Sequence, residues 1–201
     1  MPCLLSSAYL APLSYYTKLL QYDKVYVEQY DHYQKQTYRN RCLIASPNGV
    51  QALTIPVVKP DAPKAYMRDI RISDHGNWRH LHWQALISSY HRTPFFEFYA
   101  DDFAPFYEKR YAFLLDFNEA LQNMVCDLMG IETQSERTTA YELNVDGIDD
   151  FRYLVEPSKN SSFPARPYYQ MFSERQGFQP NLSIVDLLFN MGPESILYLQ
   201  P

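Results

Sequence analysis

Glycine is scarce in this sequence, with 6 among 201 residues. Neither a Gly-x-Gly-x-x-Gly loop nor a P-loop occurs, and both need glycine so that the backbone can approach a phosphate closely. A Gly-x-Ser-x-Gly nucleophile elbow is also absent. The sequence therefore disfavours standard dinucleotide binding, P-loop chemistry and an α/β-hydrolase site.

Cysteine and long apolar runs are also in short supply. Cys3, Cys42 and Cys126 are widely separated and include no Cys-x-x-Cys pair, which argues against a structural zinc site and fits free thiols in a reducing compartment. No window approaches the ~20 apolar residues of a membrane span. The apolar run near the N-terminus lacks the basic flank of a signal peptide. We therefore expect a soluble, cytoplasmic protein.

Positive charge is in deficit, since Lys plus Arg is 18 against 23 for Asp plus Glu, a net charge of −5. This disfavours nucleic-acid binding, which depends on neutralising phosphates. Tyrosine is plentiful, with 18 residues. Its ring and hydroxyl suit a packed core as well as a wet cleft or an interface. The length favours one domain over residues 1–201.

Apolar spacing and turn signals predict an α/β domain with a βαβ-type start, a β-hairpin and several peripheral helices. We expect strands at 3–7 and 24–29 with a helix between them, and hairpin strands on either side of Pro47-Asn48-Gly49. A further strand is predicted at 67–73, and a helix from Asn77 to about Tyr90. The clearest helix is at 111–130, closed by Gly130.

The C-terminal part carries a weaker pattern. Residues 132–175 hold three prolines and predict irregular structure packed on the domain. A final helix is expected within 181–193, with Ser183 as its N-cap, Asp186 completing a capping box, and Gly192-Pro193 as its end.

Four of the five histidines lie between Ser73 and His91. On a helix, His80 and His82 point in different directions and are poor ligands for one metal ion, so no metal site is predicted. His82 shares a face with Trp78 and Tyr90. It is either a packed core residue or a positioned general acid or base.

The stretch from Tyr30 to Cys42 concentrates Lys35, Arg39 and Arg41 in an otherwise acidic protein. Cations interleaved with aromatic rings and an amide suit a phosphate, a carboxylate or a nucleotide-sugar diphosphate. The alternative is a solvated loop whose charges pair with nearby acids. The stretch follows a predicted strand, where α/β folds collect ligands.

Four stretches together resemble the WbqC-like protein family. They are "AYLAPLSYYTKLLQYDKVYVEQ", "YQKQTYRNRCLIASPNGVQALTIPV", "NWRHLHWQALISSYHRTPFFEFY" and "YYQMFSERQGFQPNLSIVDLLFNMGP". The first keeps the tyrosine and proline of the family's opening segment as Tyr9 and Pro12, without its glutamine and tryptophan. The resemblance implies a role in surface-polysaccharide biosynthesis, with an amino sugar as a candidate substrate.

Two functions follow from the residues and the resemblance together. One is an enzyme that transfers an acyl or aminoacyl group to an amino sugar or nucleotide sugar, with His82 as general base and a phosphate-bearing substrate. The other is a non-catalytic module that binds a ligand or a protein partner. No cofactor is identified. The substrate-binding candidates are Tyr9, Lys35, Tyr38, Arg39, Asn40, Arg41, Trp83 and Gln170.

Overall fold

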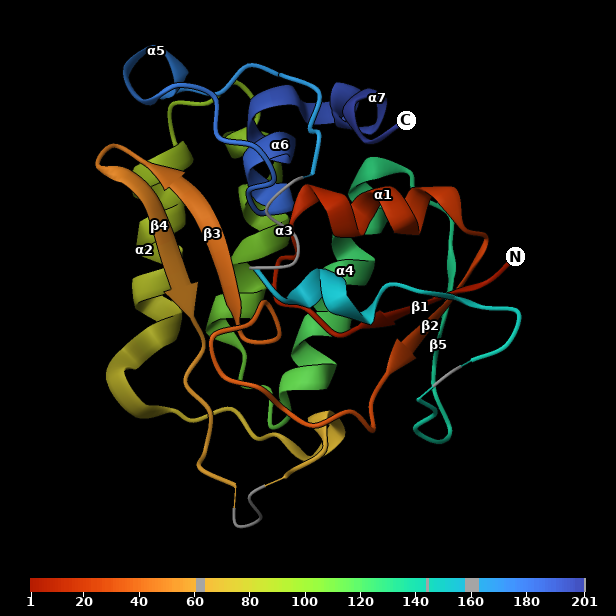
Figure 1. The fold of residues 1–201 in the computed structure, drawn as a ribbon. Coiled ribbons are helices and arrows are strands. Elements are labelled where there is room, and N and C mark those ends of the chain that lie inside the picture. The colour runs from red at the N-terminus through yellow and green to blue at the C-terminus, as the bar shows by residue number, and fades with distance from the viewer. Residues whose placement is uncertain (61–63, 144, 158–162, 201) are drawn as a thin grey trace.

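A four-stranded parallel sheet and a separate two-stranded hairpin organise the chain (Figure 1). The computed structural model describes residues 1–60, 64–143, 145–157 and 163–200. The strands are β1 (Cys3–Ser6), β2 (Lys24–Glu28), β3 (Arg41–Ser46), β4 (Gly49–Thr54), β5 (Gln134–Arg137) and β6 (Asp149–Asp150). The predicted α/β class is confirmed.

Helices cover the parallel sheet and fill the space between it and the hairpin (Figure 1). The α-helices are α1 (Leu13–Gln21), α2 (Trp78–Tyr90), α3 (Phe96–Glu108), α4 (Leu114–Met129), α5 (Ser173–Gln176), α6 (Ile184–Met191) and α7 (Ser195–Leu199). The 3-10 turns are η1 (Met67–Asp69), η2 (His75–Asn77), η3 (Arg152–Val155) and η4 (Gly192–Glu194). No helix in the described ranges is long and apolar enough to span a bilayer.

The predicted βαβ start is confirmed. β1 and β2 pair in parallel, with Cys3 opposite Val25 and Ser6 opposite Glu28, and α1 provides the crossover between them. Parallel strands need such a crossover because a tight turn makes the next strand run antiparallel to the first. β6 pairs with the other side of β1, and β5 with the other side of β2.

The predicted hairpin is confirmed as β3 and β4, which pair antiparallel with Ser46 opposite Gly49. The positive φ that the turn needs is at Gly49, where φ is 113°. Glycine adopts this backbone conformation readily because it has no Cβ. The hairpin lies beside α2, and α4 separates it from the parallel sheet (Figure 1).

The core surrounds α6. Five consecutive or near-consecutive apolar side chains of this helix are fully buried: Ile184, Val185, Leu187, Leu188 and Phe189. A helix whose side chains are buried on nearly every side is enclosed by other elements, and here even the polar Asp186 and Asn190 are buried. The predicted helices over 77–90 and 111–130 are confirmed as α2 and α4, and Gly130 ends α4 with φ of 65°. Asn77 precedes α2, but its side chain makes no cap hydrogen bond.

The strand predicted at 67–73 is wrong. Met67–Asp69 forms the 3-10 turn η1, and Arg71 and Ile72 make only isolated bridges, to Phe113 and Val57. Met67 and Ile70 are three residues apart and both are buried. Three-residue spacing suits a 3-10 turn, which has three residues per turn.

Residues 132–175 contain more regular structure than predicted, because β5 and β6 lie within them. β5 has the sequence QSER, without the apolar alternation that signals a strand. It forms the edge of the sheet, and β2 supplies its hydrogen-bonding partner. Such a strand is specified by its neighbour and not by its own pattern.

The C-terminal region also differs from the prediction. α6 ends at Met191 before Gly192 as expected, but η4 and α7 follow it. The capping box is wrong, since Ser183 Oγ donates to the carbonyl of Leu10 at 2.7 Å and the carboxylate of Asp186 is fully buried. α3 was not anticipated, and Pro105 lies within it.

Candidate functional site

The order of the parallel strands creates a natural place for a ligand. Across the sheet the strands lie β5-β2-β1-β6. From β1 the chain proceeds to one side through β2 and β5, and then returns to the other side at β6. In open α/β sheets, ligands bind beyond the carboxyl ends of the strands where the strand order reverses in this way.

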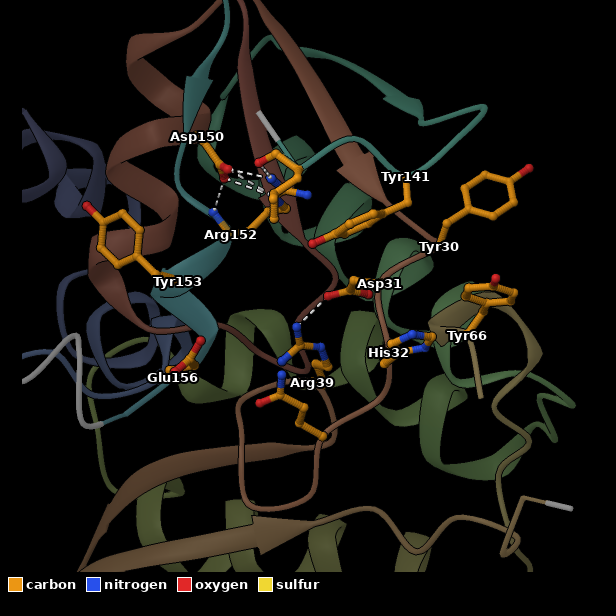
Figure 2. Close-up of a pocket in the computed structure, with 12 residues that line it drawn as sticks. Tyr30, Asp31, His32, Arg39, Tyr66, Tyr141, Asp150, Arg152, Tyr153 and Glu156 are labelled. Carbon is orange, nitrogen blue, oxygen red and sulfur yellow. Dashed lines mark hydrogen bonds and ion pairs between the residues drawn. The ribbon is translucent and has the colours of Figure 1, made fainter. Parts of the chain in front are cut away.

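A pocket of about 560 Å³ opens beyond the carboxyl ends of the parallel strands (Figure 2). We call it the edge pocket. Its walls come from segments that follow β2, β5 and β6, with one side chain from the 60s. The lining residues are Tyr30, Asp31, His32, Gln34, Arg39, Tyr66, Tyr141, Leu143, Asp150, Arg152, Tyr153 and Glu156.

A buried ion pair between Arg39 and Asp31 lies in the edge pocket. Asp31 Oδ2 also accepts a hydrogen bond from Ser6 Oγ at 3.1 Å, at the carboxyl end of β1. Asp31 Oδ1 and Arg39 Nε are buried and have no hydrogen-bond partner in the described part of the chain. Buried polar atoms are normally satisfied, so these two leave hydrogen-bonding capacity for a ligand or water.

A second ion pair in the edge pocket joins Arg152 to Asp150, and more hydrogen bonds hold its arginine in place than hold Arg39. Arg152 Nε lies 3.0 Å from both carboxylate oxygens of Asp150. The same guanidinium donates to the carbonyls of Glu142 and Leu143 and reaches the buried carboxylate of Glu28. Partial burial acts to raise the pKa of Asp150, but the hydrogen bonds and charge of Arg152 outweigh it and hold that pKa below its ordinary value. Asp150 is therefore an ionised acceptor at neutral pH.

Aromatic side chains form the rim of the edge pocket. Figure 2 shows Tyr153 on one side and Tyr30, His32 and Tyr66 on the other, with Asp31 and Arg39 between them. His32 stacks on Tyr66 with ring centroids 5.3 Å apart and an interplanar angle of 15°. Tyr66 and Tyr153 are 41% and 42% exposed, so apolar ring faces are available to a ligand.

The sequence-predicted binding residues do not converge on one place. Of the basic stretch, only Arg39 lines the edge pocket. Lys35, Asn40 and Arg41 line a different pocket, on the other side of the loop that follows β2. Tyr38 is buried. Its carbonyl accepts a hydrogen bond from Tyr9 N–H, and its own N–H donates to the carbonyl of Val155. These bonds connect the loop to the segment after β1 and to η3.

His82 and Tyr9 meet in the interior. Nδ1 of His82 lies 3.0 Å from the hydroxyl of Tyr9, which lies 2.9 Å from the hydroxyl of Tyr107. His82 is 5% exposed, and burial lowers its pKa to about 4. The imidazole is therefore neutral at pH 7, and it is not among the residues that line the edge pocket.

Trp83 and Gln170 lie in two further places. Trp83 stacks on Phe96 and Tyr107, with ring centroids 6.0 and 5.7 Å apart, and lines a small polar pocket beside α3. Gln170 is buried and donates to the carboxylate of Asp186 at 2.9 Å and to the carbonyl of Gln179.

The edge pocket contains residues that sequence reasoning passed over. Tyr30, Asp31 and His32 directly follow the predicted strand at 24–29, so the strand-end rule could have selected them. The cluster of positive charge in the same loop pointed to Lys35 and Arg41 as the binding residues instead. Tyr141, Arg152 and other lining residues come from the region predicted to be irregular, where no local signal indicates that β5 and β6 join the sheet.

One of the comparisons with known proteins identifies a family. The family model described as "WbqC-like protein family" matches residues 7–162. An uncharacterized protein of Mycobacterium tuberculosis, Rv1507c, is 29% identical over 224 aligned positions, which cover 98% of this chain and 96% of that protein. No solved structure matches significantly.

Proposed function

This chain belongs to the WbqC-like protein family, and we propose that it binds an amino sugar or a nucleotide-linked amino sugar in the edge pocket. The binding would serve surface-polysaccharide or glycoconjugate assembly, the role that the sequence resemblance implies. The observation that carries this proposal is the pairing of exposed tyrosine rings with fixed acid–arginine pairs at the reversal point of the parallel sheet.

The chemistry of the edge pocket suits a sugar. A sugar ring presents an apolar C–H face together with hydroxyls that both donate and accept hydrogen bonds. Tyr66, Tyr141 and Tyr153 offer ring faces at the rim, while Asp150 offers an ionised acceptor and Asp31 an unsatisfied one. Most specific pockets combine apolar walls with a few fixed polar groups in this way.

The amino group of the sugar gives the carboxylates a particular role. An ammonium donates three hydrogen bonds and carries a positive charge, and the carboxylates of Asp31 and Asp150, which line the pocket, are its natural acceptors. Neutral sugars would meet the same ring faces without this charged hydrogen bond. We therefore expect the pocket to prefer an amino sugar over the corresponding neutral sugar.

The finer form of the proposal is transfer of an acyl or aminoacyl group to that amine. Such a reaction needs a group that accepts a proton from the ammonium before attack. His82 is the general base proposed from the sequence. Its pKa of about 4 keeps the imidazole neutral at pH 7 but makes it a weaker base than an ordinary histidine, so this role requires that its pKa rise when substrate binds. Its burial requires that substrate binding open a path to it, because a base must come within hydrogen-bonding distance of its proton.

A non-catalytic binding module is the second candidate, and one observation favours it. His82 is buried beside Tyr9 and Tyr107 and contributes nothing to the edge pocket. Both arginines of the edge pocket are already engaged by carboxylates. A pocket built for binding alone would have these properties.

Calorimetric titration with D-glucosamine and with D-glucose tests the binding. We expect glucosamine to bind more tightly than glucose, and Tyr153→Ala to weaken glucosamine binding by about 3- to 10-fold, the loss expected for one aromatic contact. Asp31→Asn should reduce the preference for glucosamine over glucose. Tyr169→Ala is the matched control, because Tyr169 is 56% exposed and lies outside the pocket. Equal weakening by Tyr153→Ala and Tyr169→Ala would contradict the location.

Catalysis is tested separately from binding. The protein is incubated with glucosamine and acetyl-CoA, or with glucosamine and an aminoacyl donor, and products are followed by mass spectrometry. Acylated sugar formed by the wild type, and lost in His82→Gln while glucosamine still binds, would support the transferase. Glucosamine binding with no product from any donor class would favour the binding module.

A further inference from the structure

A second pocket lies on the other side of the loop that follows β2. We call it the cationic pocket. It has a volume of about 290 Å³. Its lining residues are Tyr33, Lys35, Gln36, Asn40, Arg41, Thr54, Ile55, Pro56 and Val57. They include two cations and no carboxylate, in a chain of net charge −5.

Lys35 and Arg41 are two cations that share one pocket without a carboxylate partner. Neither forms an ion pair with a carboxylate in the described ranges. Arg39, Arg137 and Arg152, by contrast, each hold at least one carboxylate. Two unpaired cations in one concavity produce a local positive potential, which attracts anions.

Buried polar atoms in the same pocket are unsatisfied. Arg41 Nε and Asn40 Oδ1 are buried and have no hydrogen-bond partner among the described residues. Asn40 is 5% exposed, and its Nδ2 donates to the carbonyl of Ile55 at 2.8 Å, which fixes its orientation. A donor and an acceptor held in place without partners indicate a site for a polar ligand.

The pocket is supported by rigid elements. Arg41 begins β3 and is paired in the ladder with Thr54, the last residue of β4. Ile55 N–H donates to the carbonyl of Asn40 at 2.8 Å, which closes the ladder beyond the strand ends. Arg41 is therefore held by a hairpin whose geometry does not depend on a ligand, while Lys35 comes from the turn that precedes β3. A site that is partly preformed loses less entropy on binding.

We propose that the cationic pocket binds the phosphate group of a small phosphorylated molecule. A guanidinium is planar and holds phosphate oxygens with paired hydrogen bonds, and an ammonium adds a compact positive charge. Arg41 and Lys35 supply this combination. Asn40 Oδ1 accepts a hydrogen bond from a hydroxyl of the group that carries the phosphate. The volume admits a phosphate and part of that group.

This inference goes beyond the proposed sugar site and is independent of it. Arg39 and Asn40 are consecutive, yet one lines the edge pocket and the other the cationic pocket. The two pockets therefore share a loop but no charged side chain. Failure of glucosamine to bind would leave the phosphate site untouched, and the reverse also holds.

The test uses inorganic phosphate and pyrophosphate as probes, titrated by calorimetry at constant ionic strength with sodium chloride. We expect saturable pyrophosphate binding by the wild type, tighter than phosphate because of its higher charge. Arg41→Gln and Lys35→Gln should each weaken it by about tenfold or more, the loss expected for a hydrogen bond to a charged group. Glucosamine binding should be unchanged in both variants.

Lys109→Gln is the matched control, because Lys109 is also exposed and lies outside the pocket. Lys35 is on the surface, so its substitution leaves the fold intact even where Arg41→Gln destabilises β3. Saturable binding that is lost in Lys35→Gln and kept in Lys109→Gln supports the proposal. It is overturned by the absence of saturable binding in the wild type, or by equal effects of Lys35→Gln and Lys109→Gln.

Discussion

The hydroxyl of Tyr9 lies 3.0 Å from Nδ1 of His82, although 73 residues separate them in the chain. Tyr9 follows β1 and His82 belongs to α2, so this hydrogen bond ties the parallel sheet to the helix beside the hairpin. Both side chains are buried. The contact explains why an apolar helix face carries a histidine, because a buried polar side chain needs a partner.

His82 should make the protein sensitive to mild acid. The unfolded chain protonates this histidine below about pH 6.5, whereas in the folded protein its pKa is about 4. The free energy of unfolding should therefore fall as the pH is lowered from 6.5 towards 4, by about 3 kcal/mol from this group. Above pH 6.5 the residue is neutral in both states and has no such effect.

Urea denaturation at a series of pH values measures this contribution. In His82→Gln the fall between pH 6.5 and 4 should be shallower than in the wild type. His80→Gln is the control, since His80 is exposed on the same helix, and it should follow the wild-type curve. A His82→Gln curve parallel to the wild type would show that the imidazole is not held neutral by burial.

Asp186 should be among the most important polar residues for stability. Its carboxylate accepts hydrogen bonds from Tyr90 Oη at 2.9 Å, Tyr168 Oη at 2.6 Å and Gln170 Nε2 at 2.9 Å. Asp186→Ala leaves the buried hydroxyls of Tyr90 and Tyr168 without their acceptor, so we expect a loss of about 3–5 kcal/mol in the free energy of unfolding. Asp127→Ala, at an exposed position in α4, should change it by less than about 1 kcal/mol. Chemical denaturation distinguishes the two, and similar losses would contradict the burial of Asp186.

Arg39 should matter more to stability than Arg137, although both form ion pairs. Arg39 is 4% exposed and its partner Asp31 is 8% exposed, so Arg39→Ala leaves a buried carboxylate unpaired and should cost about 3–5 kcal/mol. Arg137 pairs with Asp116 and Glu119 at the surface, and Arg137→Ala should cost about 1 kcal/mol or less. The comparison is made by urea denaturation. Equal costs would mean that solvent reaches Asp31 once Arg39 is removed.

Gly192 should resist substitution more than other glycines with positive φ. Its φ is 56°, and a Cβ placed there would lie 2.4 Å from Cδ1 of Phe95. Gly192→Ala should therefore lose about 2–4 kcal/mol, combining backbone strain with a clash in a packed region. Gly177→Ala shares the positive φ, but nothing lies near its Cβ, so it should lose only the backbone-strain part, about 1–2 kcal/mol. Thermal unfolding of the two variants measures the difference, and a Gly192→Ala loss no larger than that of Gly177→Ala would contradict the clash.

Local patterns predicted the elements whose signals lie within one segment. The βαβ start, the hairpin around Gly49, and the helices α2 and α4 follow from apolar spacing, turn residues and Gly130. The free, buried state of the three cysteines also agrees with the sequence. The strand at 67–73 was wrong because its apolar residues suit a 3-10 turn as well as a strand. α3 carried no clear signal, since aromatic residues lie on several faces and its sequence contains Pro105, a residue that usually disfavours a helix interior.

The candidate sites show the same division between what local sequence patterns predict and what long-range packing decides. By itself the sequence determined the family and the α/β class, because these depend on short-range patterns and matching residues. Only the tertiary structure decided which side chains share a pocket. It separated Arg39 from Lys35 and Arg41, enclosed His82 with Tyr9, and brought Arg152 and Tyr153 beside Asp31. Consecutive side chains in a loop can point into opposite pockets, and strands such as β5 and β6 gain their hydrogen bonds from distant partners. These relationships depend on long-range packing, which no single segment encodes.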